Sequence, residues 1–134
     1  MKKSIRDAVY NKFGGRCAYS GTPLELDWQV DHVVSKRECW FLMIDPDRIE
    51  NMVPAQKIIN HYKRSLSVDK FRNNWLGGLH KRLAKLPANP RTERSKGRIR
   101  YLLKVASCFG ITKHKPFSGV FYFETVGKCL NTKT

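Results

Sequence analysis

The first thirty residues contain one stretch with a helical pattern and one with the alternation of a strand. Ile5, Val9 and Phe13 are apolar at four-residue spacing, which places them on one face of a helix. A serine before them and two glycines after them are typical of a helix start and a helix end. Residues 24–30 then alternate apolar and polar side chains, a pattern that predicts a half-buried strand.

The next stretch holds an apolar patch, a short extended piece and a helix. Residues 39–44 are apolar throughout, and we expect them in the core, with a contact between two copies of the chain as the alternative. Residues 49–53 predict a second extended piece. Pro54 suits the first position of a helix, and no breaker follows until Leu66. A hairpin followed by a helix is therefore the expected local architecture.

The second half of the chain has mainly helical patterns. Residues 67–86 predict a helix in which the pair Gly77-Gly78 favours a kink or break, since each Gly costs roughly 1 kcal/mol relative to Ala. Residues 96–109 predict a basic helix, and residues 120–124 a late strand. The sequence thus predicts the α+β class.

Length and composition favour one globular domain over residues 1–134. The chain has 134 residues, of which 41% are hydrophobic. No apolar stretch reaches the ~18 residues that a membrane span needs, so we expect no membrane partner and a cytoplasmic location. The four cysteines form no C-x-x-C pair, and we interpret them as free thiols in a reducing compartment.

The charge is strongly positive and confined to one region. Residues 1–50 carry eight basic and eight acidic residues, whereas residues 51–134 carry 18 basic and three acidic ones, which accounts for the whole net charge of +15. Such an excess is typical of proteins that bind a polyanion. We therefore expect a nucleic acid as the partner.

Four residues form a candidate site for phosphodiester chemistry. Asp31 and His32 are adjacent at the end of the predicted strand, Asn51 follows after nineteen positions, and Asn60 lies on the predicted helix. A carboxylate and an amide oxygen can hold a divalent cation, and a neutral imidazole can take a proton from water. Because neighbouring strand residues point to opposite faces, the strand must end, bulge or bend near this pair if both residues are to meet one site.

These residues resemble the motifs of the HNH endonucleases. The pair at 31–32 matches the family's Asp-His, residues 49–55 (IENMVPA) are similar to its Asn-Leu-Val-Pro-Ala stretch, and residues 60–63 (NHYK) to its Asn-x-x-Lys. The resemblance is strong over about residues 6–66 and weak beyond, where the chain looks like small phage HNH proteins. It implies a ββα-metal core at residues 16–66, followed by a basic helical extension at 67–134.

The resemblance also implies a role for each residue. His32 would be the general base, Asp31 and Asn60 would bind one divalent metal, Mg²⁺ or Mn²⁺, and Asn51 would hold the His32 ring or its loop. The activity would be nicking or double-strand cleavage of DNA, expected to be double-stranded. From the motif and the basic segments, the expected phosphate contacts are Lys63, Arg64, Lys81, Arg82, Lys85, Arg98 and Arg100.

The chain departs from the family at its structural zinc site. Many members hold zinc with two C-x-x-C pairs, but here the first pair keeps only Cys17 and the second falls at Gln56 and Ile59. A single thiolate cannot complete a tetrahedral zinc site, so we expect no structural zinc and assign the bracing of the hairpin to residues 39–44.

Two other functions stay open on the sequence alone. A nucleic-acid-binding protein could keep the scaffold without catalysis, and a junction-selective resolvase would use the same four residues. The sequence leaves the oligomeric state and the recognised DNA undetermined.

Overall fold

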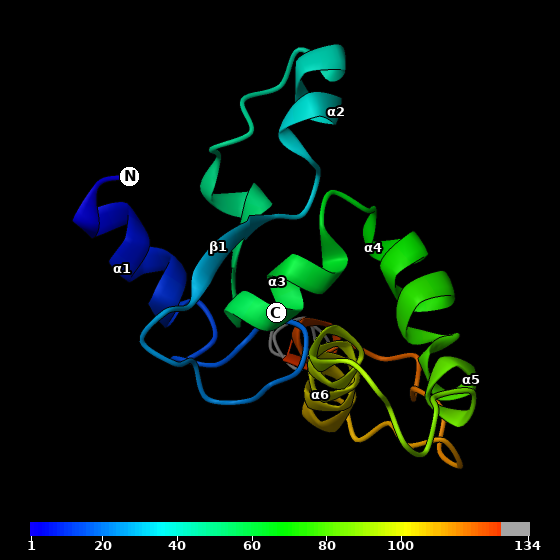
Figure 1. Cartoon of the computed structure of the whole chain (residues 1–134). Helices are drawn as coiled ribbons and strands as arrows, with labels where there is room; N and C mark the ends of the chain where they lie inside the picture. The colour runs from blue at the N-terminus through cyan, green and yellow to red at the C-terminus, as the bar shows by residue number, and fades with distance from the viewer. Residues whose placement is uncertain (127–134) are drawn as a thin grey trace. The chain divides into compact units, whose positions relative to one another are not determined.

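The computed structural model of the chain describes residues 1–126. Its described part is mixed α+β, with helices around one two-stranded antiparallel sheet. The elements in chain order are α1 (Lys3–Asn11), β1 (Gln29–His32), α2 (Lys36–Leu42), η1 (Ile49–Asn51), β2 (Met52–Ala55), α3 (Lys57–Lys63), α4 (Val68–Lys70), η2 (Phe71–Leu76), α5 (Leu79–Ala84) and α6 (Glu93–Cys108) (Figure 1).

The chain divides into two compact units. The first unit comprises Met1–Val68 together with the described residues from Val120 to 126, and the second comprises Asp69–Gly119. The first break lies close to the expected start of the extension at residue 67. The return of the chain at Val120 was not expected, and it gives the last described residues a place in the first unit.

The sheet of the first unit pairs β1 with β2 in a regular register. Gln29 faces Ala55, and His32 faces Met52 at the other end. Strand β2 is followed after one residue by α3. Because both strands have only four residues, the sheet is too small to bury its own faces, and other segments must cover it.

Helix α1 supplies one cover of this sheet. Val9 of α1, Trp28 and Met52 form a buried cluster, against which Leu24 and Val30 pack. The guanidinium of Arg6 also lies 3.9 Å from the centre of the Trp28 ring and donates a hydrogen bond to the Trp28 carbonyl. The predicted N-terminal helix is therefore confirmed, although it begins at Lys3 and the Ser4 side chain does not cap it.

The aromatic residues after Val120 pack against the loop that carries Tyr19. The rings of Phe121 and Phe123 lie 5.2 and 5.9 Å from the ring of Tyr19, and the Phe123 amide donates to the Ala18 carbonyl. The strand predicted at residues 120–124 is wrong, since residues 122–126 are helical. The Glu124 side chain accepts a hydrogen bond from the Phe121 amide, as in a capping box, and this interaction favours a helix start over a strand.

Two more expectations in the first unit are corrected. The predicted strand at 24–30 begins only at Gln29, and Leu26 is fully exposed in a turn. Ala55, the last residue of β2, pairs with Gln29, so β2 has no further residue that could pair with the residues before Gln29. The helix expected from Pro54 begins at Lys57 instead, because Pro54 belongs to β2 and its carbonyl accepts from the Ala18 amide.

The second unit is helical, as its sequence pattern predicts. The helix expected over 67–86 is broken, with the π-helical turn η2 ending before Gly77-Gly78 and α5 starting after them. A Cβ on Gly77 would lie 2.3 Å from the Asn73 carbonyl oxygen, so a side chain does not fit there. Helix α6 begins at Glu93, three residues before the predicted start, since the Thr92 side chain caps it by accepting from the Ser95 amide.

The described cysteines and helices bear on two further expectations. Cys17, Cys39 and Cys108 are free thiols, and Cys129 lies outside the described residues. Among residues 1–126, none of the helices combines the length and the apolar character that crossing a membrane requires.

Candidate active site

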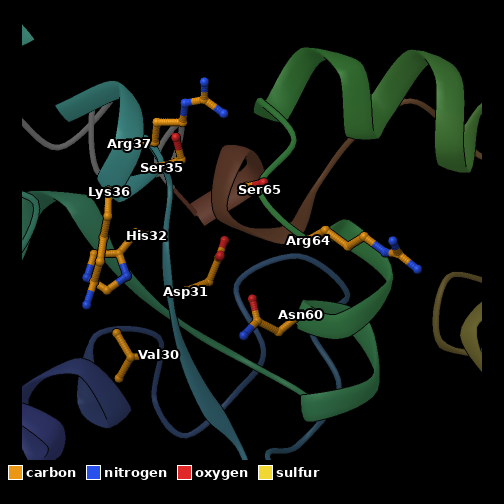
Figure 2. A pocket seen from close by; sticks show the side chains of 9 residues that line it. All are labelled: Val30, Asp31, His32, Ser35, Lys36, Arg37, Asn60, Arg64 and Ser65. Atoms are coloured by element: carbon orange, nitrogen blue, oxygen red, sulfur yellow. The ribbon is translucent and has the colours of Figure 1, made fainter. Parts of the chain in front are cut away.

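Three of the four predicted site residues line one open pocket of the first unit. Asp31, His32 and Asn60 border a cavity of about 370 Å³. The remaining walls come from β1 itself, from the segment that follows it and from the residues just after α3. Figure 2 shows their side chains: Val30, Ser35, Lys36, Arg37, Arg64 and Ser65. The pocket therefore combines a carboxylate, an amide and an imidazole with three cationic side chains.

Strand β1 carries Asp31 and His32 to this pocket at its C-terminal end. His32 is the last residue of β1, and the register shows no bulge. The two side chains leave opposite faces of the strand, as Figure 2 shows, with Asp31 on the side of α3 and His32 on the side of Val30. The strand ends only after this pair, and both residues keep the regular register with β2, so the expectation that the strand is interrupted to bring both side chains to one face is wrong.

The Asp31 carboxylate is buried and held by two donors. Its Oδ2 atom accepts a hydrogen bond from the Tyr19 hydroxyl and lies 3.2 Å from the Nζ atom of Lys63. Burial, and then the neighbouring Asp31 carboxylate, raise the pKa of Tyr19 well above its ordinary value, so this hydroxyl remains a donor at neutral pH. Within residues 1–126 no side chain or amide donates to the second oxygen, Oδ1, which is left for the pocket.

Asn60 presents its amide oxygen to the same space. Its Nδ2 atom donates to the Oε1 atom of Gln29 at 2.8 Å, which fixes the orientation of the amide. Figure 2 shows the oxygen turned toward the Asp31 side chain and the nitrogen turned away. Two acceptor oxygens thus face one space, and a hard divalent cation is the kind of ligand that such a pair fits. In the described part of the chain, no three His, Cys, Asp or Glu side chains gather as a metal-binding group.

His32 is oriented by Asp47, a residue outside the predicted site. Its Nε2 atom lies 2.8 Å from the Oδ1 atom of Asp47, and this hydrogen bond holds the pKa of the Asp47 carboxyl below its ordinary value. A neutral imidazole that donates through Nε2 has its basic lone pair on Nδ1.

Asn51 holds the loops around His32 rather than the His32 ring. Its Nδ2 atom donates to the carbonyls of Val34 and Pro46, and its Oδ1 atom accepts from the Val34 amide. Asn51 is buried and does not line the pocket. Because these bonds tie the segment after His32 to the turn that carries Asp47, Asn51 positions both partners of the His32–Asp47 contact.

Lys63 does not occupy the predicted phosphate-binding position. Of the two residues of α3 assigned to the site, Asn60 lines the pocket and Lys63 does not. The Lys63 side chain is 1% exposed, and its ammonium pairs with Asp31 instead of facing solvent. The neighbouring Arg64 is exposed and lines the pocket, because α3 ends at Lys63 and Arg64 adopts a left-handed φ of 55°.

The other predicted phosphate contacts lie in the second unit. Most are exposed on α5, just after it, or on α6, whereas Arg82 is half-buried and packs over the Trp75 ring at 5.4 Å. The residues concerned are Lys81, Arg82, Lys85, Arg98 and Arg100. The cations that line the pocket of the first unit are a separate group of three, Lys36, Arg37 and Arg64.

Gln56 joins the loop where the family's zinc site would be. Its Nε2 atom donates to Thr22 Oγ1 and to the Pro23 carbonyl, and its Oε1 atom accepts from the Glu25 amide. The assignment of this bracing role to residues 39–44 is wrong, since Cys39 alone of the described apolar patch is buried. Hydrogen bonds from one buried amide therefore hold the loop against the start of α3.

Two residues that contribute to the site were missed from the sequence. Tyr19 follows Cys17 closely in a stretch that the sequence analysis considered for zinc, and Asp47 lies in a turn fifteen residues after His32. Neither residue belongs to a periodic pattern of apolar and polar positions, because each lies in a loop rather than in a helix or strand.

Compared with protein-family models, with curated proteins and with solved structures, the chain shows no match. A functional assignment therefore depends on the motif residues and on the geometry of this pocket.

Proposed function

We propose that the chain is a metal-dependent nuclease that hydrolyses phosphodiester bonds in DNA, with the site chemistry of the HNH endonucleases that its motifs resemble. The observation that carries the proposal is that Asp31, His32 and Asn60 all line one open pocket edged by cations, with Asp31 and Asn60 facing each other and His32 on the other side of β1. The order of two antiparallel strands and a helix is the arrangement that the resemblance implies.

The residues of the pocket divide the chemistry among themselves. His32, held by Asp47 through Nε2, accepts the proton of an attacking water at Nδ1. Asp31 and Asn60 are the side chains that would hold a divalent cation, and a bound cation supplies charge stabilisation at the scissile phosphate. Lys36, Arg37 and Arg64 attract the phosphates and keep the backbone at the pocket. Breaking the P–O3′ bond would leave 5′-phosphate and 3′-hydroxyl ends.

One observation favours a second candidate, a DNA-binding protein without catalysis. The ammonium of Lys63 lies 3.2 Å from Asp31, so the carboxylate already has a positive partner. A cation would have to bind at the remaining oxygen and at Asn60. The same assay separates the two candidates, because a binding protein would retain DNA without cutting it.

The test is conversion of supercoiled plasmid to nicked or linear form in Mg²⁺ or Mn²⁺, with EDTA as the blank. His32→Ala should lower the rate by roughly 10²–10⁴, the usual contribution of a general base, while DNA affinity stays within about twofold. His114→Ala is the matched control, because His114 is exposed in the second unit and should cut normally. Cleavage by His32→Ala at the wild-type rate would refute the assignment.

A further inference from the structure

Helix α2 exposes a row of large apolar side chains beside the candidate site. Trp40 is 75% exposed, Phe41 66%, Leu42 55% and Met43 94%. In Figure 1, α2 stands clear of α1 and α3, beyond the end of β1. Buried Cys39 is the residue of this segment that faces the interior. We refer to Trp40–Met43 as the α2 apolar edge, and its exposure in a charged chain points to a ligand.

The α2 apolar edge adjoins the candidate active site through Lys36. Lys36 borders the pocket of Asp31 and His32, and it also borders a second open pocket of about 370 Å³ that Trp40 and Met43 line. Trp40 follows Lys36 by four residues, one helical turn of ~5.4 Å. Cationic side chains and an aromatic surface therefore lie about one turn apart on the same helix.

The charge of the molecule identifies the class of occupant. A second copy would double the net charge of +15 in the assembly, and this overall repulsion opposes self-association. A nucleic acid matches both features, because its phosphates complement Lys36 and Arg37 and its bases offer flat surfaces to an aromatic ring. The Phe41 ring meets the Trp40 ring edge to face at 5.2 Å and 74°, so it supports Trp40 from the side.

We propose that Trp40 stacks on an unpaired base next to the phosphodiester that the pocket binds. The inference rests on the proposed function for the location of that phosphodiester, and it names the substrate class as DNA with unpaired bases at the cleavage position. Paired bases in an intact duplex are stacked on their neighbours and do not present a free face. Gapped, branched or single-stranded DNA does present one.

The test compares two substitutions of Trp40 that differ in one property. Trp40→Phe keeps an aromatic face, and Trp40→Leu keeps an apolar side chain without one. Affinity for a short fluorescent single-stranded oligonucleotide and for the matching blunt duplex is measured by anisotropy in EDTA, where no cleavage occurs. Leu26→Ala is the control for loss of exposed apolar surface in the same unit, since Leu26 is fully exposed in the turn before β1 and lines neither pocket.

The expected result is a loss that depends on the aromatic face and on the unpaired base. Trp40→Leu should weaken binding of the single strand by roughly 5- to 100-fold, the usual range for one base stacked on one side chain. Trp40→Phe should stay within about threefold, and Leu26→Ala and all duplex affinities within about twofold. Because Trp40 is exposed, thermal melting of the variants should match the wild type.

Several results would overturn the inference. Equal affinities of Trp40→Leu and wild type for the single strand would exclude stacking, and an equal loss in Trp40→Phe and Trp40→Leu would exclude a role for the aromatic face. A wild-type dimer in sedimentation that Trp40→Leu converts to a monomer would assign the α2 apolar edge to self-association.

The outcome for the proposed function is read separately, from plasmid cleavage in Mg²⁺. Trp40-dependent binding without cleavage would support the stacking role and refute the nuclease. Cleavage together with binding that does not depend on Trp40 would support the nuclease and refute the stacking role. The lack of any nucleic-acid binding would refute both proposals.

Discussion

Replacing Lys63 by Met tests whether this lysine serves the fold or the DNA. The Lys63 side chain is 1% exposed and that of Asp31 6% exposed, and their charged atoms lie 3.2 Å apart. Methionine retains the length of the side chain but leaves the Asp31 carboxylate buried with the Tyr19 hydroxyl as its one donor. Removing one partner of a buried ion pair costs about 3–5 kcal/mol.

A loss of this size is large compared with the ~5–15 kcal/mol by which folded domains are stable. We expect Lys63→Met to lower the midpoint of thermal unfolding by about 10–20 °C and to lower the urea midpoint accordingly. Adding Asp31→Asn to Lys63→Met should restore part of the stability, because the unpaired charge is then removed.

Arg64 provides the matched control, because it is the next residue and its side chain lines the pocket. Arg64→Gln should change the free energy of unfolding by no more than about 0.5 kcal/mol. Its DNA affinity should show a logarithmic salt slope smaller by about 0.9, the contribution of one phosphate contact. Lys63→Met, measured under conditions where it is folded, should keep the wild-type slope.

The reasoning would be refuted by the opposite pair of results. If Lys63→Met melts like the wild type and loses about one phosphate contact, then Lys63 faces the DNA, as its motif position predicted. The buried ion pair between the Lys63 ammonium and the Asp31 carboxylate would then be refuted.

Three further outcomes are expected. Asp47→Asn should lower plasmid cleavage by about 10- to 100-fold with unchanged DNA affinity, the usual effect of losing an orienting partner, and cleavage at the wild-type rate would exclude this role. The pKa of Asp47 is lowered in the native state. Its contact with His32 therefore stabilises the fold above the unfolded-state pKa of Asp, and this stabilisation is lost as the pH falls through the native-state pKa of Asp47. The difference in urea midpoint between wild type and Asp47→Asn should shrink from about pH 6 to pH 3. Gln56→Ala should destabilise the chain by about 1–3 kcal/mol, since it leaves buried polar groups unpaired. EDTA should leave the wild-type melting temperature unchanged. A lower melting temperature in EDTA, together with stoichiometric zinc in the protein, would contradict the role of the Gln56 hydrogen bonds. Exchanging four exposed cations of the second unit for Gln should reduce the salt slope of DNA binding by up to about 3.6 if each contacts a phosphate, and an unchanged slope would place the contacts elsewhere; the four are Lys81, Lys85, Arg98 and Arg100.

The elements with a strong local pattern were predictable. Residues 5–13 carry an apolar stripe, and α1 forms there. The glycine pair at 77–78 divides a helical stretch, and the basic pattern before Phe109 forms α6. Local sequence is sufficient in these cases because the periodicity and the end residues act within one helical turn.

The candidate site was predictable in its residue types and only partly in its contacts. The spacing of Asp31, His32 and Asn60 predicted a shared site, and the three line one pocket. The partner of His32 is Asp47, which a turn brings within 2.8 Å. No pattern in the sequence encodes this contact, because it depends on how Asn51 joins the two loops.

The sequence by itself determined the helices with a clear apolar stripe or capping signal, the region that carries the positive charge, and the residue types that the pocket brings together. The tertiary structure decided which faces are covered. Lys63 is buried because α3 turns it toward Asp31 and Tyr19, and the α2 apolar edge is exposed because no described segment covers it. Periodicity defines the faces of an element, but burial requires a partner element from a distant part of the chain, and that pairing is a property of the whole fold.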